Sequence, residues 1–336
     1  MRILMTSILC QSGLMTHVND LAKYLHSQGI FVAIAFKRVD YLDEPAQNSI
    51  LGELHTMAIP YLLYDSTEEL LEFLRAQECN LIHAHSHATF QTATEASLSQ
   101  GVPLICTLHS VYPWQHLFGA TLHVAQRIIA VGPAQAYGAR RFSEKISIVQ
   151  NAIDTRHFVP KTPREKQGDL INILWYGRVD GRLTRGLHTL DRVAPLLPKH
   201  IRITGLGTAQ YVPINIPLIP WTDHPLPFLQ QSQITFAHGR SLREAMSAGS
   251  IGMLLGCGYG GMVTERRLTE DNLILDAFPE YRLRRPRVHK LVQDILTLSM
   301  LDLEQLRREA RLVAERHFDL EDMGAKIGKI YRGVLS

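Results

Sequence analysis

The sequence has no long hydrophobic run and few cysteines. No stretch of about 18 consecutive apolar residues occurs in the 336-residue chain, and the apolar start "MRILMTSILCQSG" is short and interrupted. We therefore expect neither a membrane-spanning helix nor a secretory signal. The four cysteines (Cys10, Cys79, Cys106 and Cys257) are scattered and form no Cys-x-x-Cys pair or other metal spacing, which suits a reducing cytoplasm.

Several other signals are missing. The sequence has no Gly-x-Gly-x-x-Gly motif, which argues against a dinucleotide-dependent dehydrogenase, and no solenoid repeat or low-complexity segment. The formal net charge of +3 is too small to favour nucleic acid as a partner. Charge gathers locally in "YRLRRPRVHK", residues 281–290. This segment is either a solvated surface or a contact for an acidic molecule or an anionic lipid headgroup.

Short apolar runs alternate with amphipathic segments, as in a parallel sheet covered on both faces. The first set of expected strands is "RILMTS", "IFVAIAF", "NLIHAH", "VPLICTLH", "QRIIAVG" and "KISIVQN", and the second is "INILWYG", "HIRITGLG", "ITFAHG" and "SIGMLLG". The first predicted helix carries Val18, Leu21, Ala22 and Leu25 on one face and ends before Gly29. The Pro-rich, charged segment "VPKTPREKQGD" between the two sets is the expected linker, and the C-terminal region is helical with a break near His317.

Polar residues in the first half follow predicted strands, where ligands of parallel sheets bind. Gly13 and His17 follow the first strand at a helix N-terminus, an environment suited to phosphate or an oxyanion. His83 and His85 alternate on one strand, and His87 continues the spacing, so a metal site has to be considered, although no Cys or carboxylate lies nearby. His109 ends the next strand and is either a cleft residue or a buried core histidine.

The second half has cationic and glycine-rich loops after its strands. Arg178, Arg182 and Arg185 lie in one loop, where they either neutralise a diphosphate or are solvated. "TGLG" contains Gly205 and Gly207 and is a weak signal by itself. "GCGYGGMVT", residues 256–264, is either a backbone nest for an anion or a flexible turn.

Ser241 and Glu244 have the spacing of a helix capping box. In that interpretation the serine hydroxyl accepts from the backbone at Glu244, and the glutamate reaches back to the serine amide. Glu244 is alternatively a ligand for a substrate, and the local spacing favours capping without deciding the question.

The order of these motifs resembles that of the GT-B glycosyltransferases of retaining glycosyltransferase family 4. "SGLMTHVNDLAKYLHSQG" is similar to the family's opening Gly-Gly-x-x-x-His-x-x-x-Leu-Ala helix, with only the second glycine kept. "LIHAH" and "PLICTLHS" resemble the paired motifs that end in an active-site histidine, and "VQNAIDTRHF" is close to an Asn-Gly-(Ile/Val)-Asp stretch. "YGRVDGRLTRG" is similar to the loop that holds the donor diphosphate, and "SLREAMSAG" resembles a Glu-Ala-Met-Ala-x-Gly segment.

The chain also departs from the family pattern. Phe236 stands where the family usually has another glutamate near the donor sugar, and the turn that follows is shortened. Arg185 replaces the usual lysine of the phosphate loop and lies two residues further along, and Ala152 replaces a glycine.

The resemblance implies an α/β fold of GT-B architecture, with two doubly wound, Rossmann-like parallel-sheet domains facing across a cleft. The implied domains are residues 1–160 on the acceptor side, residues 168–316 on the donor side, and residues 317–336 as a C-terminal helix that crosses back to the N-terminal domain. The implied site residues are His109, Arg178 and Arg185 as catalytic groups; Gly13, Gly177, Gly205, Gly207, Arg240, Ser241, Glu244, Gly258, Gly260 and Gly261 around the donor; and His17 and His85 on the acceptor side or in the cleft.

The implied reaction is retaining transfer of a sugar from a nucleoside-diphosphate sugar to an acceptor hydroxyl of a glycan, a lipid-linked or a small molecule. In the family the glutamate before Ala-Met contacts the nucleotide ribose, which favours Glu244 as a ligand. No cofactor and no catalytic metal are expected, since no Asp-x-Asp motif precedes a strand end. The family also implies a cytoplasmic location, with peripheral contact at the inner face of the membrane as an option. It further implies a role in bacterial cell-surface glycan or polysaccharide synthesis. The alternatives are an inactive sugar-nucleotide binding partner of another transferase and a GT-B nucleotide-sugar epimerase.

Overall fold

The chain forms two compact units. The computed structural model describes residues 1–10, 12–39, 44–161, 170–177, 184–208, 211–271, 273–275 and 283–336. Unit 1 comprises Met1–Asn151 together with Leu320–Ser336, and unit 2 comprises Ala152–Asp319. Most of the predicted linker and the arginines Arg178 and Arg182 lie outside the described residues.

Unit 1 is built on a parallel sheet in the order β3-β2-β1-β4-β5-β6-β7. The strands are β1 (Arg2–Ile8), β2 (Phe31–Lys37), β3 (Tyr61–Tyr64), β4 (Leu81–Ala84), β5 (Leu104–Leu108), β6 (Arg127–Ala130) and β7 (Ile146–Ile148). The helices are α1 (Gly13–Ser27), α2 (Glu44–Thr56), α3 (Thr67–Ala76), α4 (Phe90–Gln100), α5 (Trp114–Leu117), α6 (Gly119–Val124), α7 (Pro133–Gly138) and α14 (Leu320–Leu335), with short 3-10 segments η1 (His87–Thr89) and η2 (Arg140–Lys145).

Unit 2 has a second sheet in the order β10-β9-β8-β11-β12-β13. Its strands are β8 (Ile171–Tyr176), β9 (Ile201–Leu206), β10 (Leu218–Ile219), β11 (Ile234–Ala237), β12 (Ile251–Leu255) and β13 (Tyr259–Met262). Its helices are α8 (Thr184–Val193), α9 (Leu226–Gln231), α10 (Gly239–Ser247), α11 (Glu265–Thr269), α12 (Val288–Ser299) and α13 (Leu303–His317), with a 3-10 turn η4 (Ala194–Leu196). All described pairs are parallel except β12 with β13.

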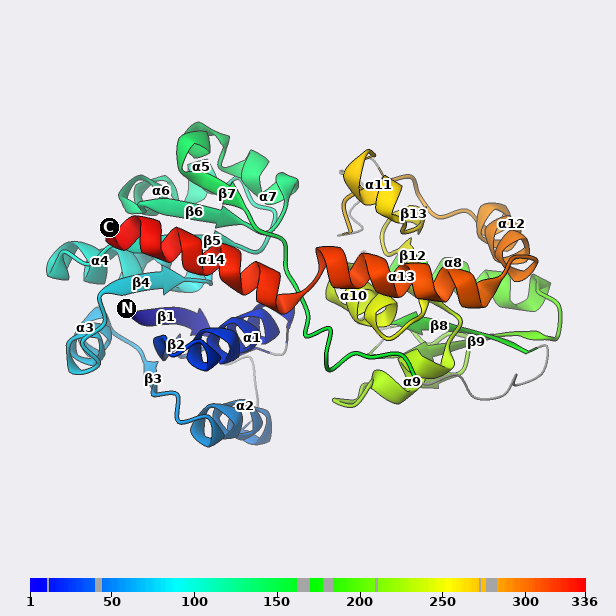
Figure 1. Cartoon of the computed structure of the whole chain (residues 1–336), viewed down its shortest axis with the longest axis horizontal. Helices are drawn as coiled ribbons and strands as arrows, with labels where there is room; N and C mark the ends of the chain where they lie inside the picture. Colours follow the sequence, from blue (N-terminus) through cyan, green and yellow to red (C-terminus); the bar gives the residue numbers. More distant parts are fainter. Residues whose placement is uncertain are drawn as a thin grey trace. The chain divides into compact units, whose positions relative to one another are not determined.

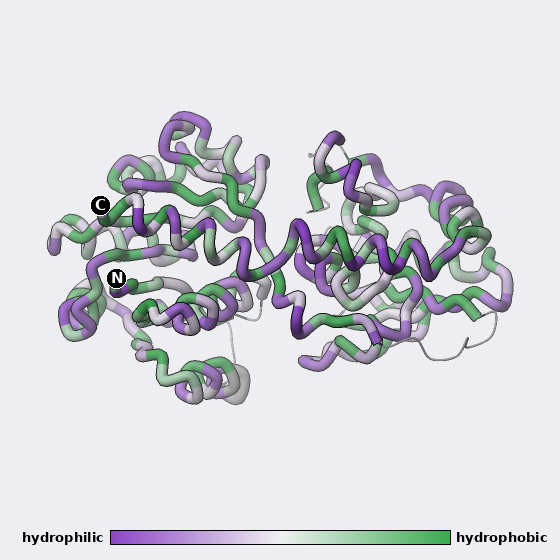
Figure 2. The backbone as a smooth tube through the Cα atoms, viewed as in Figure 1, coloured by the Kyte–Doolittle hydropathy of each residue, from purple (hydrophilic) through white to green (hydrophobic). Residues whose placement is uncertain are grey.

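Alternate side chains of the central strands enter cores on both faces of the sheet, as expected for buried parallel strands. On β8, Ile173 and Trp175 belong to one apolar cluster of unit 2, whereas Leu174 and Tyr176 belong to the other. Hydrophobic and hydrophilic stretches alternate along the helices that cover these sheets (Figure 2). The two α/β parallel-sheet units therefore confirm the fold class predicted from the sequence.

The helix that follows β1 forms as its sequence pattern predicts. Val18, Leu21, Ala22 and Leu25 on α1 are all fully buried, and Gly29 adopts a φ of 70° just after the helix ends. The predicted break near His317 is also present, since α13 ends there and α14 begins at Leu320. Helix α14 packs beside α1 on the sheet of unit 1 (Figure 1).

All ten predicted strands are present, and three further strands were not expected. Strands β3 and β10 are short and lie at the edges of their sheets. Their hydrophobic pattern was too weak to predict a strand. Strand β13 lies inside the glycine-rich segment that was expected to be an anion nest or a flexible turn. It returns antiparallel to β12, so the flexible-turn alternative was wrong for residues 259–262, whereas anion binding by the segment stays a prediction.

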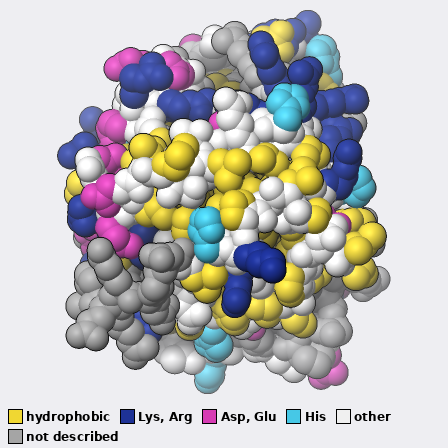
Figure 3. Space-filling view, turned by 90° about the vertical axis from the view of Figure 1, so that its right-hand side faces the viewer, with side chains coloured by type: hydrophobic (Ala, Val, Ile, Leu, Met, Phe, Trp, Pro, Cys, Tyr) yellow, Lys and Arg dark blue, Asp and Glu magenta, His cyan; other side chains and the backbone are white. Residues whose placement is uncertain are grey.

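The surface of unit 2 is mixed. In the view from the right-hand side of Figure 1, Lys and Arg side chains gather at one margin of a face whose centre is largely hydrophobic (Figure 3). The described basic residues of the segment 281–290, Arg284, Arg285, Arg287 and Lys290, are exposed. Within the described parts of the chain, no helix is both long and apolar enough to cross a bilayer.

The packing of α14 on α1 depends on a glycine. A Cβ atom at Gly324 would overlap the ring of Tyr24 on α1, whereas a Cβ at Gly328 of the same helix would come no closer than 3.6 Å to a guanidinium nitrogen of Arg332. Both glycines are buried on α14. Gly324 and Gly328 are thus both buried glycines of the same helix, and they differ only in the space around them.

We therefore expect Gly324→Ala to destabilise the protein by about 1–3 kcal/mol, because the methyl group forces Tyr24 or α14 to move. Gly328→Ala is the matched control, and it should be neutral or stabilising by up to about 1 kcal/mol because alanine favours helix. Thermal unfolding followed by circular dichroism measures both. Equal melting temperatures for the two variants would contradict this account of the α1–α14 contact.

Candidate functional site

The two sheets share a feature that decides where side chains gather. In unit 1 the chain moves outward from β1 through β2 to β3 and then resumes on the other side of β1 with β4. In unit 2 it moves from β8 through β9 to β10 and resumes beside β8 with β11. Loops on either side of such a switch diverge and leave a crevice at the carboxyl ends of the strands.

In unit 2 a candidate polar group beyond the strands is the carboxylate of Glu244 on α10. Its side chain is buried, and both oxygens accept hydrogen bonds. Tyr176, the last residue of β8, donates its hydroxyl to Oε2 at 2.8 Å, and Arg240 donates Nε to Oε1 at 2.7 Å. The glutamate is therefore fixed from a strand end and from its own helix at once.

This arrangement answers the question about capping. Helix α10 begins at Gly239 with His238 as its N-cap, so Ser241 lies inside the helix and not at its start. No side chain caps the described N-terminus of α10. The capping interpretation of Ser241 and Glu244 was wrong because the helix starts three residues earlier than that interpretation requires. The same chemistry does occur at Ser66 and Glu69, which form a reciprocal capping box on α3.

The partners of Glu244 hold defined protonation states. Burial, and secondly the nearby Glu244 carboxylate, raise the pKa of the Tyr176 hydroxyl, so it remains a donor at neutral pH. Arg240 also donates Nη1 to the backbone carbonyl of Ala152 at 3.3 Å. Each carboxylate oxygen has two lone-pair directions, so Glu244 retains the capacity to accept further hydrogen bonds.

Gly177 and Gly207 directly follow β8 and β9, and a Cβ atom at Gly177 would lie 3.6 Å from the Ser241 hydroxyl of α10. Their φ angles are 146° and 147°, and a Cβ at Gly207 would overlap the carbonyl of Gly177. Both amides, and that of Gly205, donate to backbone carbonyls of neighbouring segments: Leu206, Ile219 and Pro217. These glycines let the two strand ends approach closely, and their N–H groups are already engaged.

The glycine-rich segment after β12 also serves packing. Cβ atoms at Gly258 and Gly260 would come within 2.5 and 2.6 Å of Leu283 and Leu254, respectively, and Gly261 has a φ of 73°. The carbonyls of Gly260 and Met262 accept hydrogen bonds from Arg267. The segment thus forms a strand held close to the core.

Of the three arginines that the sequence places in one loop, the structure describes Arg185. It is exposed and stands in the first turn of α8. Its neighbour Gly186 lies against the chain after β12, because a Cβ there would come within 2.6 Å of the Gly256 carbonyl oxygen. Arg185 is therefore on the same side of unit 2 as the glycine-rich segment, whereas Arg178 belongs to the part of the chain outside the described residues.

Two other sequence assignments meet different environments. Gly13 is the first residue of α1, and there is open space around the position of a Cβ atom. Phe236, at the position where the family pattern has a glutamate, is fully buried in an apolar cluster of unit 2. A side chain at position 236 therefore packs in the core.

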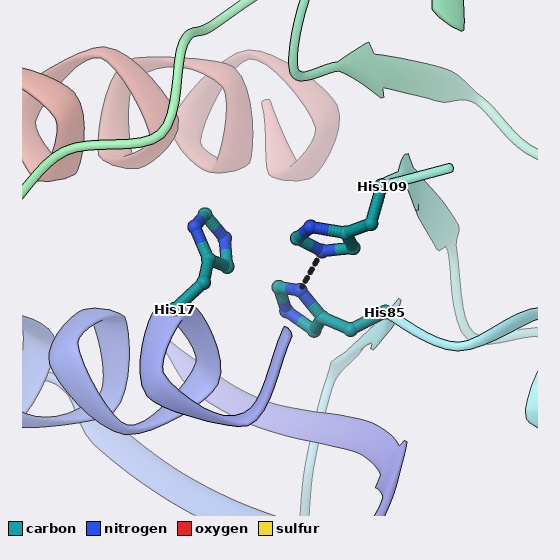
Figure 4. Close-up of side chains that lie close together, drawn as sticks. All are labelled: His17, His85 and His109. Carbon is teal, nitrogen blue, oxygen red and sulfur yellow. Dashed lines mark hydrogen bonds between the residues drawn. The ribbon is translucent and has the colours of Figure 1, made fainter. Parts of the chain in front are cut away.

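In unit 1 three histidines from different elements gather at one place (Figure 4). His17 is on α1, His85 follows β4, and His109 follows β5. The ring centroids are 4.7 Å apart for His17 and His109, 5.4 Å for His17 and His85, and 5.7 Å for His85 and His109. Nδ1 of His85 and Nε2 of His109 are 3.4 Å apart. We refer to these three residues as the histidine cluster.

Two of the three rings of the cluster are shielded from water, and His85 and His109 are held uncharged. His17 and His85 are buried, and His109 is partly exposed. Burial in the first place, and then neighbouring histidines, hold the pKa of His85 and of His109 well below the usual value for histidine. Both imidazoles are therefore neutral at physiological pH and offer lone pairs.

The side chains of His83, His85 and His87, which alternate in the sequence, do not meet at one place. Strand β4 ends at Ala84, so the alternation of side chains is lost before His87, whose ring instead contacts Tyr112 and Phe118. His83 is close to His85, but both of its nitrogens are bonded, Nδ1 to the Tyr331 hydroxyl at 2.6 Å and Nε2 to Thr107 at 2.7 Å. His83 is therefore a structural residue.

Sequence reasoning missed two residues at these places. Tyr176 could have been noticed as an aromatic residue at the end of a strand, directly before Gly177. Tyr331 had no such signal, because its contact with His83 spans 248 positions of the chain. Local spacing holds no information on a pairing of that range.

Comparison with known proteins gives a family for part of the chain and a fold for all of it. Residues 11–157 match the model of Glycosyltransferase Family 4. A search of curated proteins finds no match. Among solved structures, Anabaena HepE in complex with UDP is 14% identical with a TM-score of 0.74, covering 99% of this chain and 100% of HepE.

Two further structures agree in fold. A glycosyltransferase from Rickettsia africae ESF-5 is 15% identical with a TM-score of 0.75, covering 100% of this chain and 99% of its own. The lipopolysaccharide outer core galactosyltransferase WaaB is 14% identical with a TM-score of 0.66, covering 99% and 100%. The family match covers most of unit 1, and the structural matches extend the fold over both units. Residues 11–157 are therefore similar to glycosyltransferase family 4, and the whole chain has the GT-B fold of these solved glycosyltransferases.

Proposed function

We propose that the protein transfers a sugar from a nucleoside-diphosphate sugar to an acceptor hydroxyl with retention of the anomeric configuration. The observation that supports it best is the Glu244 carboxylate, buried and oriented by Tyr176 and Arg240 beside the switch point of unit 2. A carboxylate fixed in this way can accept hydrogen bonds from both hydroxyls of a ribose without changing its conformation. The orientation is already provided by the two donors.

The donor diphosphate needs cations because negative charge develops on it as the sugar leaves. Arg185 is exposed in the first turn of α8, where the helix N-terminus also favours an anion. We assign the stabilisation of the leaving group to Arg185 together with Arg178, and the nucleotide contacts to Arg240, Ser241 and Glu244.

In the proposed reaction the bond between the anomeric carbon and the diphosphate oxygen breaks, and a bond from that carbon to the acceptor oxygen forms on the same face. The hydroxyl proton passes to the departing diphosphate, so atoms and charge balance without a covalent enzyme intermediate. His109 orients the donor sugar as a neutral imidazole, and His17 and His85 line the acceptor side. The transfer itself uses no catalytic metal.

The first donor to test is a UDP-sugar, because Anabaena HepE has been crystallised with UDP and with UDP-glucose. For the acceptor we propose a glycan or lipid-linked molecule in bacterial surface-polysaccharide synthesis, made at the cytoplasmic side. The exposed Arg284, Arg285 and Arg287 supply positive charge for an acidic acceptor or an anionic headgroup.

An epimerase with the same architecture is the competing enzyme class. A putative UDP-N-acetylglucosamine 2-epimerase from Listeria monocytogenes is 13% identical with a TM-score of 0.59, which shows a shared fold and no more. Incubation with a UDP-sugar without acceptor separates the classes. Slow release of UDP supports a transferase, formation of an epimer supports an epimerase, and binding without turnover supports an inactive partner.

Glu244→Gln should weaken binding of UDP by about 10- to 100-fold, because a charge-assisted hydrogen bond to the ribose is lost. Calorimetric titration measures the affinity. The decisive comparison uses 2′,3′-dideoxy-UDP, which binds the parent protein more weakly but should bind the variant about as well as UDP does. Glu304→Gln, which also removes a carboxylate paired with an arginine but at an exposed site, is the control and should leave both affinities unchanged. An unaltered affinity of Glu244→Gln for UDP would remove the residue from the donor site.

His109→Ala should lower the turnover number by about 100-fold or more with little change in UDP affinity, because the sugar loses its orienting contact and the nucleotide contacts remain. Transfer is measured as UDP release in the presence of an acceptor, and affinity by calorimetry. His123→Ala, at an exposed histidine of the same unit, should behave as the parent does. Normal turnover of His109→Ala would exclude His109 from the mechanism.

A further inference from the structure

The histidine cluster has a property that sugar transfer does not use. Among the described residues, His17, His85 and His109 are the only group of three metal-ligating side chains whose ligand atoms all lie within 4.8 Å of one another. The three come from α1 and from the ends of the neighbouring strands β4 and β5. Regular elements of one unit therefore hold all three rings, which makes the cluster a preorganised scaffold.

The distances suit a tetrahedral ion. With zinc–nitrogen bonds of about 2.0–2.1 Å, two imidazole nitrogens on one tetrahedral ion lie about 3.3 Å apart. The separation of Nδ1 of His85 and Nε2 of His109 is 3.4 Å. Three such rings on one ion would have their centroids about 5 Å apart, and the three observed separations run from 4.7 to 5.7 Å. The ligand atoms of the three rings lie within 4.8 Å of one another, so the more distant pairs would close by about 1.5 Å or less to reach the separation of about 3.3 Å on one ion.

The contrast with His83 shows what the cluster lacks. Both nitrogens of His83 have close hydroxyl partners, at 2.6 and 2.7 Å. In His85, Nδ1 contacts Nε2 of His109 at the long distance of 3.4 Å, and the buried Nε2 has no hydrogen-bond partner. A buried polar atom without a partner is costly. A cation held by Nδ1 of His85 and Nε2 of His109 would replace this long contact, and Nε2 of His85 would then carry the ring proton.

We infer that His17, His85 and His109 form a binding site for one divalent ion of the zinc type, with a fourth coordination position left for water or a ligand oxygen. An all-imidazole donor set favours Zn²⁺, Cu²⁺, Ni²⁺ or Co²⁺ over Mg²⁺ and Ca²⁺, which prefer oxygen ligands. Three protein ligands and one open position are typical of zinc sites that bind exogenous molecules, whereas closed structural sites use four protein ligands.

The site lies wholly in unit 1 and does not depend on the proposed transfer reaction. Both roles use the imidazole of His109, so one molecule cannot perform them at the same moment. Zinc-loaded protein should therefore transfer sugar more slowly than metal-free protein. Binding of the metal by itself is the test of the site, and it is independent of whether the protein is an active transferase.

The experiment is a titration of the untagged, chelator-treated full chain with Zn²⁺ in competition with a chromogenic chelator, followed by Co²⁺ as a spectroscopic probe. We expect one ion per chain, a rise in melting temperature on addition of zinc, and the intense visible absorption of four-coordinate Co²⁺. His17→Gln should weaken zinc binding by at least about 10-fold and abolish that cobalt band, because one ligand is lost.

His26→Gln is the matched control, since His26 lies exposed on the same helix, and it should bind zinc as the parent protein does. His85→Gln tests the site a second time in case His17→Gln fails to fold. Absence of stoichiometric zinc binding by the parent protein would overturn the inference. Zinc affinity of folded His17→Gln or His85→Gln equal to that of His26→Gln would also overturn it.

Discussion

The arrangement of the candidate site residues follows from the strand order of each parallel sheet. In each sheet the chain adds strands on one side of the first strand and then resumes on its other side. A parallel strand can be followed only by a crossover, so all carboxyl ends lie at one edge, and the loops diverge where the order switches. In unit 1 this places the helix after β1 beside the ends of β4 and β5, which brings His17, His85 and His109 together. In unit 2 it brings the end of β8 beside the start of α10, which joins Tyr176 to Glu244.

Burial of the Glu244 carboxylate is a second constraint, because removing a charge from water costs several kcal/mol unless partners replace the solvent. Arg240 and Tyr176 are those partners, and they come from the same helix and from the adjacent strand end. A carboxylate needed only for stability could have remained exposed, as Glu304 does in its pair with Arg307. A buried and fixed carboxylate that can still accept hydrogen bonds is the arrangement expected of a binding residue.

The elements that the sequence predicted well are those whose information is local. Buried strands such as β1 and β8 and the amphipathic α1 have strong patterns, and all ten predicted strands exist. The capping interpretation of Ser241 failed because the same spacing occurs inside a helix that starts earlier. The flexible-turn alternative for the glycine-rich segment failed at residues 259–262 because glycines also permit close packing, as at Gly260 against Leu254. The His83–Tyr331 contact and the gathering of His17 with His109 depend on tertiary packing, which no local pattern encodes.

The histidine cluster shows why a family motif does not exhaust the chemistry of its residues. Neutral imidazoles held close together serve equally well to orient a hydroxyl-rich sugar and to ligate a soft cation, because both tasks need lone pairs that water does not already occupy. His83, on the same strand as His85, is excluded from either task by its bonds to Thr107 and Tyr331. What distinguishes a functional histidine from a structural one in this unit is therefore the number of its nitrogens that the fold leaves unbonded, and for His85 that number is at least one.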